Sequence, residues 1–162
     1  MNPMISKFVD SKFMTEEQAQ YVENAINNNE SIVVSGHRST GTRPFMATLM
    51  GVAKKQYSTV QVKGFDDINA DTEYLLILAL DNLDFEALVG DAIGAKAPFI
   101  SIKEPEHPVS LMKVMKQQFK LGKGIGKKIH TIEAKKVDGV PYVDKITEFC
   151  MDESGKIVKT DL

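Results

Sequence analysis

The sequence predicts an α/β protein with a mostly parallel sheet that ends in an antiparallel β extension. Short apolar, β-branched segments alternate with helix-type patterns along residues 15–128. From Ile129 onward the helix-type pattern stops, and the turn signals Asp138-Gly139 and Glu153-Ser154-Gly155 separate three strand-like runs. Strands that alternate with helices favour parallel pairing, whereas strands joined by tight turns favour antiparallel pairing.

Composition and charge favour one domain over residues 1–162, with a lead-in over 1–14, an α/β core over 15–128 and a β meander over 129–162. The chain is 43% apolar and 26% charged, as ordinary globular proteins are. Its net charge of −2 gives no general attraction to nucleic acid or acidic membranes. The single cysteine excludes an internal disulfide, and no run approaches the roughly 20 apolar residues that span a bilayer. We therefore expect a cytoplasmic protein with no membrane insertion.

The first clear helix is predicted to begin after Thr15, which forms a capping-box pair with Gln18. Three asparagines at 27–29 end this helix, and a short strand follows over Ser31–Ser35. The segment SGHRSTGTRPF, residues 35–45, then leads into a helix of about a dozen residues.

The next two strands are predicted over residues 57–62 and 73–80, with a polar connection over 64–71. The sequence EYLLILAL at 73–80 is the most apolar stretch of the chain. We therefore expect it to form a central strand that is buried on both faces.

Asp84 is expected to cap a helix over residues 85–93, and residues 98–102 are expected to form another short strand. Pro108 suits the first turn of the following helix, which carries apolar residues between Val109 and Phe119.

The loop over residues 36–41 has the glycine spacing of a phosphate-binding loop but lacks its catalytic side chains. In the motif G-x-x-x-x-G-K-[ST], the lysine contacts the β- and γ-phosphates and the hydroxyl binds magnesium. Here Gly36 and Gly41 have the required spacing, but Thr42 replaces the lysine and Arg43 replaces the hydroxyl residue. Because Thr42 suits an N-cap and Pro44 suits a first turn, we expect the loop-to-helix shape to survive without the chemistry.

Two interpretations of this loop are open. In the first, it binds an anion through backbone N–H groups and two arginines. The candidate residues are then Gly36, Arg38, Ser39, Thr40, Gly41, Thr42 and Arg43. Arginine binds anions but neither ligates magnesium nor reproduces the point charge of lysine. In the second interpretation, the segment is a plain strand–turn–helix connection without a ligand.

Four segments carry a resemblance to a known family through their order and spacing. They are EEQAQYVENAINNNESIVVSGHRSTGTRP, EYLLILALDNLDFEAL, APFISIKEPEHPVSLMKVM and KIHTIEAKKVDGVPYVDKITEF. The chain resembles the RecA-like motor domain of the type II/type IV secretion ATPases, the hexameric P-loop motors of pilus assembly, pilus retraction and conjugative export. The resemblance covers residues 12–160 and implies a P-loop NTPase (RecA-like) three-layer sandwich, with ATP and magnesium as the family's ligands.

The departures from that family fall on catalytic positions. Asp81 lies where the family has the Walker B glutamate; it could orient a water, or it is a solvated residue at the end of a strand. The family's histidine motif is replaced by Lys103-Glu104-Pro105, and His107 is interpreted as a surface residue before Pro108. The connection from Val62 to Glu73 is too short for the family's acidic segment and arginines. We also expect the family's separate N-terminal domain to be lacking.

A lysine-rich segment, Lys113–Lys128, holds six lysines and no acidic residue. It is either a patch that contacts nucleic acid or the solvated face of a helix followed by a glycine-containing connection. Since Phe119 is the only nearby aromatic residue, the second interpretation is favoured. The three histidines have no metal-ligand spacing with the cysteine, so no metal site is expected.

These observations favour a catalytically degenerate relative of the secretion ATPases, a pseudo-ATPase that acts through protein interaction. Phosphoryl transfer depends on lysine, metal and further cationic groups, and several of these are missing here. We expect weak or no binding of ATP and magnesium, and partners that are further copies of the chain or a related motor. Two alternatives are open. One is a divergent nucleotide- or phosphate-binding enzyme that uses Arg38 and Arg43, an NTP hydrolase if active. The other is a nucleic-acid-binding module that uses the lysine-rich segment.

Overall fold

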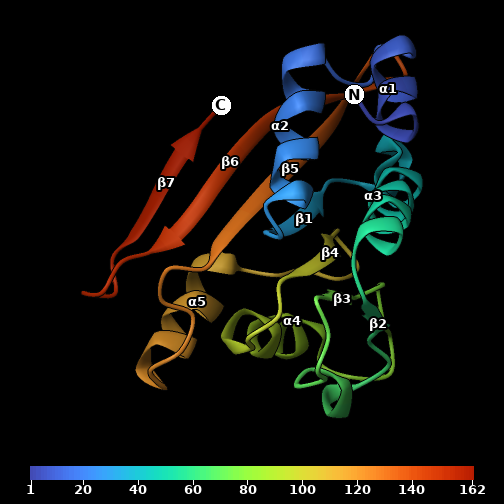
Figure 1. Cartoon of the computed structure of the whole chain (residues 1–162). Helices are drawn as coiled ribbons and strands as arrows, with labels where there is room; N and C mark the ends of the chain where they lie inside the picture. Colours follow the sequence, from blue (N-terminus) through green and yellow to red (C-terminus); the bar gives the residue numbers. More distant parts are fainter.

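The computed structural model describes residues 1–162 and contains a seven-stranded sheet with helices on both faces (Figure 1). The strands are β1 (Ser31–Ser35), β2 (Thr59–Gln61), β3 (Tyr74–Leu76), β4 (Phe99–Lys103), β5 (Lys128–Val137), β6 (Val140–Met151) and β7 (Ile157–Asp161). The helices are α1 (Pro3–Asp10), α2 (Glu16–Asn27), α3 (Thr42–Gln56), α4 (Phe85–Gly94) and α5 (Leu111–Lys120). Two short 3-10 turns, η1 (Arg38–Thr40) and η2 (Phe65–Asp67), complete the secondary structure.

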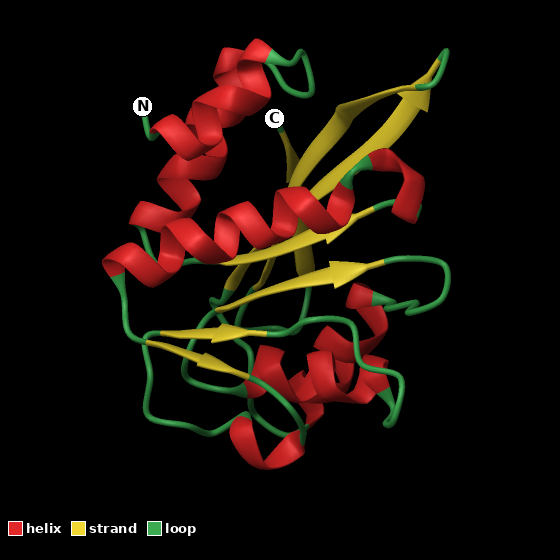
Figure 2. Ribbon diagram, turned by 90° about the vertical axis from the view of Figure 1, so that its right-hand side faces the viewer, coloured by secondary structure: helices red, strands yellow, loops and turns green.

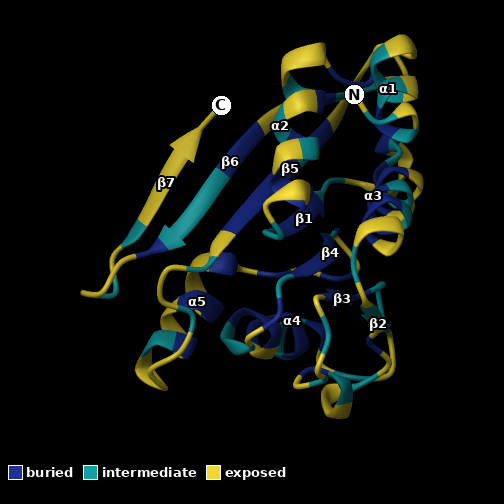
Figure 3. Ribbon diagram, viewed as in Figure 1, coloured by how far each residue is buried: buried dark blue, intermediate teal, exposed yellow.

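The strand order β2-β3-β4-β1-β5-β6-β7 confirms a mostly parallel sheet with an antiparallel extension. The first five strands in that order pair in parallel, and β6 and β7 add to β5 in antiparallel orientation. Figure 2 shows one group of helices, α1–α3, on one side of the sheet and α4 and α5 on the other. A single cluster of 41 buried hydrophobic residues extends through these layers, so they share one core. In Figure 3, burial is deepest on the central strands, while β7 is largely exposed.

The chain leaves β1 and β4 in opposite directions, and this makes their carboxyl ends the topological switch point of the sheet. After β1, α3 crosses one face toward β2, whereas after β4, α5 crosses the other face toward β5. The two strands are neighbours, with Ser35 paired to Lys103 at their carboxyl ends. In open α/β sheets, such a switch point is where ligands bind.

Three predicted local signals are confirmed. The Thr15 hydroxyl accepts the Gln18 backbone N–H at 3.1 Å, and Gln18 Oε1 accepts the Thr15 N–H at 2.9 Å. The Asp84 carboxylate accepts a backbone N–H in the first turn of α4 at 3.1 Å. In the turn between β5 and β6, Asp138 and Gly139 have φ values of 51° and 77°, as a two-residue hairpin turn requires.

Three predicted boundaries differ from the structure. Residues 1–14 contain the helix α1, whose N-cap Asn2 accepts the Met4 backbone N–H. The strand predicted over 73–80 shortens to β3, because the chain diverges from β4 after Ile77, whose N–H still donates to a β4 carbonyl. The strand predicted over 57–62 shortens to β2, Thr59–Gln61.

Pro108 does not lie in the first turn of α5. That helix begins at Leu111, with Ser110 as its N-cap. The preceding residues are held outside the helix because Glu104 and His107 exchange backbone hydrogen bonds of 3.3 and 2.9 Å.

Lys127, in the lysine-rich segment, caps the carboxyl end of α4. Lys127 Nζ donates to the carbonyl oxygens of Ala92, Ala95 and Ala97 at 2.8, 2.9 and 2.7 Å. It also lies 5.6 Å from the centroid of the Phe99 ring. Burial lowers the pKa of Lys127 to about 7, while the three carbonyl acceptors and the negative end of the helix dipole favour the ammonium form.

Lys127→Met is expected to lower the free energy of unfolding by about 2 kcal/mol, because three carbonyl oxygens lose a shared donor. Denaturant unfolding measures the change. The control Lys116→Met removes a lysine from the exposed surface of α5 and is expected to change stability by less than about 0.5 kcal/mol. Equal effects of the two substitutions would contradict the role assigned to Lys127.

Candidate functional site

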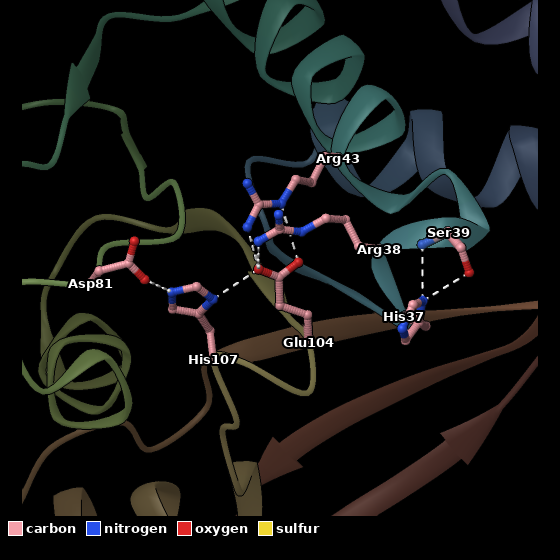
Figure 4. Close-up of polar contacts among 7 residues, drawn as sticks. All are labelled: His37, Arg38, Ser39, Arg43, Asp81, Glu104 and His107. Atoms are coloured by element: carbon pink, nitrogen blue, oxygen red, sulfur yellow. Dashed lines mark hydrogen bonds and ion pairs between the residues drawn. The ribbon is translucent and has the colours of Figure 1, made fainter.

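Charged side chains from three segments meet at the carboxyl ends of β1, β4 and β3 (Figure 4). The loop after β1 carries Arg38 and leads to Arg43 in the first turn of α3. The loop after β4 carries Glu104 and His107, and the segment after β3 carries Asp81. In Figure 4, both arginines and the histidine point toward the Glu104 carboxylate. The switch point therefore contains one connected set of ionisable groups.

The predicted phosphate-binding loop is a closed turn. The Thr40 backbone N–H and its hydroxyl both donate to the His37 carbonyl oxygen, at 2.9 and 2.5 Å. The Ser39 backbone N–H donates to His37 Nδ1 at 3.1 Å. Two N–H groups that an anion-binding loop would direct to a ligand are therefore engaged within the loop itself.

Backbone geometry explains both glycines of this loop. Gly36 has a φ of 150°, and a Cβ there would lie 2.7 Å from the Ala134 carbonyl oxygen and 2.9 Å from Thr40 Oγ1. Gly41 has a φ of 76° and is the N-cap of α3. The prediction that Thr42 is the N-cap is wrong, because the left-handed turn between η1 and α3 favours glycine at the cap and places Thr42 inside the helix.

Thr42 lies buried at the sequence position where a phosphate-binding loop has its lysine. It is 0% exposed, and its Oγ1 has no hydrogen-bond partner. A buried hydroxyl without a partner costs about 1–3 kcal/mol. The short side chain also brings no positive charge to the start of α3.

Glu104 is the centre of the site. Its side chain is 0% exposed, and Arg43 donates to both carboxylate oxygens, from Nε to Oε2 at 3.2 Å and from Nη2 to Oε1. Arg38 Nη2 lies 3.9 Å from Oε1. The hydrogen bond from Arg43 holds the pKa of Glu104 below its ordinary value despite burial, and the same bond raises the pKa of Arg43. A buried carboxylate therefore engages two of the five N–H donors of the guanidinium that was predicted to bind an external anion, and neutralises its charge.

His107 connects Glu104 to Asp81. Its Nδ1 lies 2.8 Å from Glu104 Oε1, and its Nε2 lies 2.6 Å from Asp81 Oδ1. The interpretation of His107 as a surface residue is wrong, since it is only 6% exposed and its ring packs edge-on against Phe85. Because both ring nitrogens face carboxylates, the doubly protonated imidazolium is the form that donates to both.

Asp81 is 92% exposed, which agrees with the interpretation of a solvated residue after a strand. It contacts the site through His107. Beside it lies a cleft with a volume of about 380 Å³. The acidic residues that line this cleft are Asp81, Asp84, Glu86 and Glu106. Since Lys113 pairs with Glu86, the remaining negative charge comes from Asp81, Asp84 and Glu106, and it opposes the approach of a polyphosphate.

The role of Glu104 was not predicted from the sequence. Lys103-Glu104-Pro105 was interpreted only as the loss of a histidine motif. The available signal was the three-residue spacing between Glu104 and His107 across Pro105, since a tight turn brings such positions together.

The lysine-rich segment does not present all of its charges to solvent. Lys113 pairs with Glu86, and Lys128 lies 4.0 Å from Glu30. Lys127 is enclosed against α4. This arrangement leaves fewer free lysines for a phosphate backbone and favours a structural role for the segment.

The histidines do not form a metal site. His130 is 4% exposed and lies between the Tyr21 hydroxyl at 2.7 Å and Glu30 Oε1 at 2.9 Å. Burial and, to a smaller extent, the nearby carboxylates Glu148 and Glu30 raise the pKa of the Tyr21 hydroxyl to about 12, so Tyr21 is a neutral partner of His130. No group of three or more His, Cys, Asp or Glu side chains is placed to hold a metal ion.

Comparison with known proteins gives no family assignment: no protein-family model and no curated protein sequence matches the chain. No helix is both long enough and apolar enough to cross a bilayer.

Glu104→Gln is expected to lower the free energy of unfolding by about 2–3 kcal/mol at neutral pH, because two buried contacts lose their anionic acceptor. The expected loss lies below that of a fully enclosed pair, since the Arg43 side chain is 38% exposed. Folding lowers the pKa of Glu104 from an ordinary value of 4.5. The ionised carboxylate therefore stabilises the fold above that pH, and the stabilisation is lost as the pH falls through the lower, folded-state pKa.

Urea unfolding at several pH values measures this effect. The difference between wild type and Glu104→Gln should shrink as the solution is acidified below the ordinary glutamate pKa. Glu106→Gln is the matched control, because Glu106 is exposed. A difference that does not depend on pH would contradict the assigned role of Glu104.

Proposed function

We propose that the protein is a degenerate P-loop NTPase-like protein, similar in fold to the secretion ATPases, that does not hydrolyse nucleotide and acts through protein interaction. The observation that carries this proposal is the contact between Glu104 and Arg43. The Glu104 carboxylate binds Arg43, the cationic group that the loop would otherwise offer to a phosphate. The proposed partners are further copies of the chain or a related motor.

Three features of the switch point oppose phosphoryl transfer. Thr42 brings no positive charge to the position of the catalytic lysine. Asp81 is engaged by His107 and lies beside an acidic cleft. Since phosphoryl transfer depends almost wholly on positioning and charge stabilisation, the combined loss of these groups leaves little catalysis.

The topology supports the fold that this proposal requires. β1 lies inside the parallel part of the sheet and leads through the Gly36–Gly41 loop directly into α3. This connection lies at the switch point, where α/β proteins bind their ligands. A strand–loop–helix geometry without the corresponding side chains is what a degenerate P-loop protein would retain.

ATP binding and turnover by the full chain test the proposal. Isothermal titration with ATP or ADP in the presence of magnesium is expected to give no specific heat, and phosphate release is expected to stay at background. Asp81→Asn is the control, because Asp81 is exposed and its replacement keeps the side chain's shape. A turnover on the order of 1 s⁻¹ or faster that Asp81→Asn abolishes would overturn the proposal.

A divergent phosphate-binding function is the second candidate, and Arg38 is the residue that favours it. Its side chain is 54% exposed and lies 3.9 Å from Glu104, so it is free to approach a ligand.

Titration with inorganic phosphate, followed by NMR of the backbone amides of residues 36–43, separates the two candidates. Under the first proposal the wild-type amides do not shift, while Glu104→Gln gains phosphate binding because the internal carboxylate charge is removed. Phosphate binding by the wild type that Arg38→Gln weakens by roughly tenfold or more would favour the second candidate.

A further inference from the structure

A second cleft lies on the face of the sheet that carries α5. It has a volume of about 480 Å³ and is bounded by Ser110–Met112 at the start of α5 and by residues of β1, β4, β5, β6 and β7. The site described above consists of Arg38, Arg43, Asp81, Glu104 and His107, and none of these residues lines the second cleft. Cavities of roughly 300–1,000 Å³ are typical of small-molecule sites.

The register of the sheet gathers polar side chains in this cleft. Ser35 pairs with Lys103 on β4 and with Glu133 on β5, and Glu133 pairs with Lys145 on β6. Residues paired in this way project from the same face. Two residues further along the strands, the next set of paired residues is Val33, Thr131, Thr147 and Asp161. The set after that includes Phe149 and Lys159. A sheet face covered by a helix is normally apolar, so this polar face is suited to water or a ligand.

Two lysines of the cleft have no carboxylate partner. The Asp161 carboxylate is already engaged, because it accepts the Thr147 hydroxyl at 2.8 Å and lies 3.7 Å from Lys145 Nζ. Lys103 on β4 and Lys159 on β7 also line the cleft, and neither has a carboxylate oxygen within ion-pair distance, although Lys103 is near enough to help lower the pKa of Glu86. Lys103 and Lys159 are four strand spacings apart across the sheet, about 19 Å, and four residues apart along the strands, about 13 Å, so their backbones are about 23 Å apart. The cleft therefore has a positive charge at each end, and the long lysine side chains shorten the distance between the two ammonium groups.

Apolar surface lies between these charges. Leu111 and Met112 contribute it from α5, and Phe149 contributes it from β6, with Lys159 Nζ 6.0 Å from its ring centroid. Glu133 adds one unpaired acceptor next to Lys145.

We propose that this cleft binds an elongated organic dianion with a negative group at each end and an apolar middle, as an α,ω-dicarboxylate has. Lys103 binds one end of the ligand and Lys159 binds the other. Leu111, Met112 and Phe149 contact its methylene groups. This cleft is separate from the site around Glu104, so the proposed dianion binding does not depend on nucleotide binding at that site.

Suberate and octanoate are the probes, because they have the same chain length and differ by one carboxylate. Amide NMR of the full chain is expected to show suberate shifts at Leu111, Thr131 and Thr147. Octanoate should bind roughly tenfold more weakly, since one charge-assisted contact is lost. Lys103→Gln and Lys159→Gln should each weaken suberate binding by a similar factor, and Glu133→Gln should strengthen it.

Lys136→Gln is the control, because it removes the same charge from an exposed position on the β5–β6 hairpin. It is expected to leave suberate binding unchanged, and the spectra report whether each variant is folded. Equal affinity for suberate and octanoate, or equal effects of the cleft lysines and Lys136, would overturn the proposal. An absence of cleft shifts at about 10 mM suberate would also overturn it.

Discussion

The buried carboxylate of Glu104 is the contact on which the carboxyl-terminal edge of the sheet depends. It connects α3 through Arg43 and the loop after β1 through Arg38. Through His107 it also connects the segment after β3, at Asp81. Since a buried charge is tolerated only where it is paired, these contacts require one another. The carboxylate that organises three loops thus also engages Arg43, one of the two arginines predicted to bind an anion.

Local sequence signals predicted the elements whose ends are determined within a few residues. The capping box at Thr15, the N-cap at Asp84 and the turn at Asp138-Gly139 each act over at most four positions, so one sequence contains them fully. The length of β3 was not predictable in the same way. Its apolar pattern continues to Leu80, but pairing stops where the chain diverges from β4, and that divergence is a tertiary feature.

The candidate site was predicted only in part, because some of its contacts join residues that are far apart in the sequence. The glycine spacing and the arginines singled out the loop after β1, and the topology then places this loop at the switch point. Arg43 and Glu104 are 61 residues apart in the sequence, however, and neither has a local pattern that reveals the other. His107 was misassigned because a histidine before proline resembles a surface turn, whereas the backbone pairing with Glu104 turns its ring inward.

The position of β7 has a consequence for the solution behaviour of the chain. β7 is the outermost strand, and its backbone covers the end of the twelve-residue strand β6 from Thr147 to Met151. Lys159 and Asp161 place charges on this outer strand, and charged edges resist pairing with the sheet of another molecule. Without β7, the backbone of Thr147–Met151 on β6 would be an unpaired edge. β7 therefore shields this part of β6 from pairing with the sheet of another molecule.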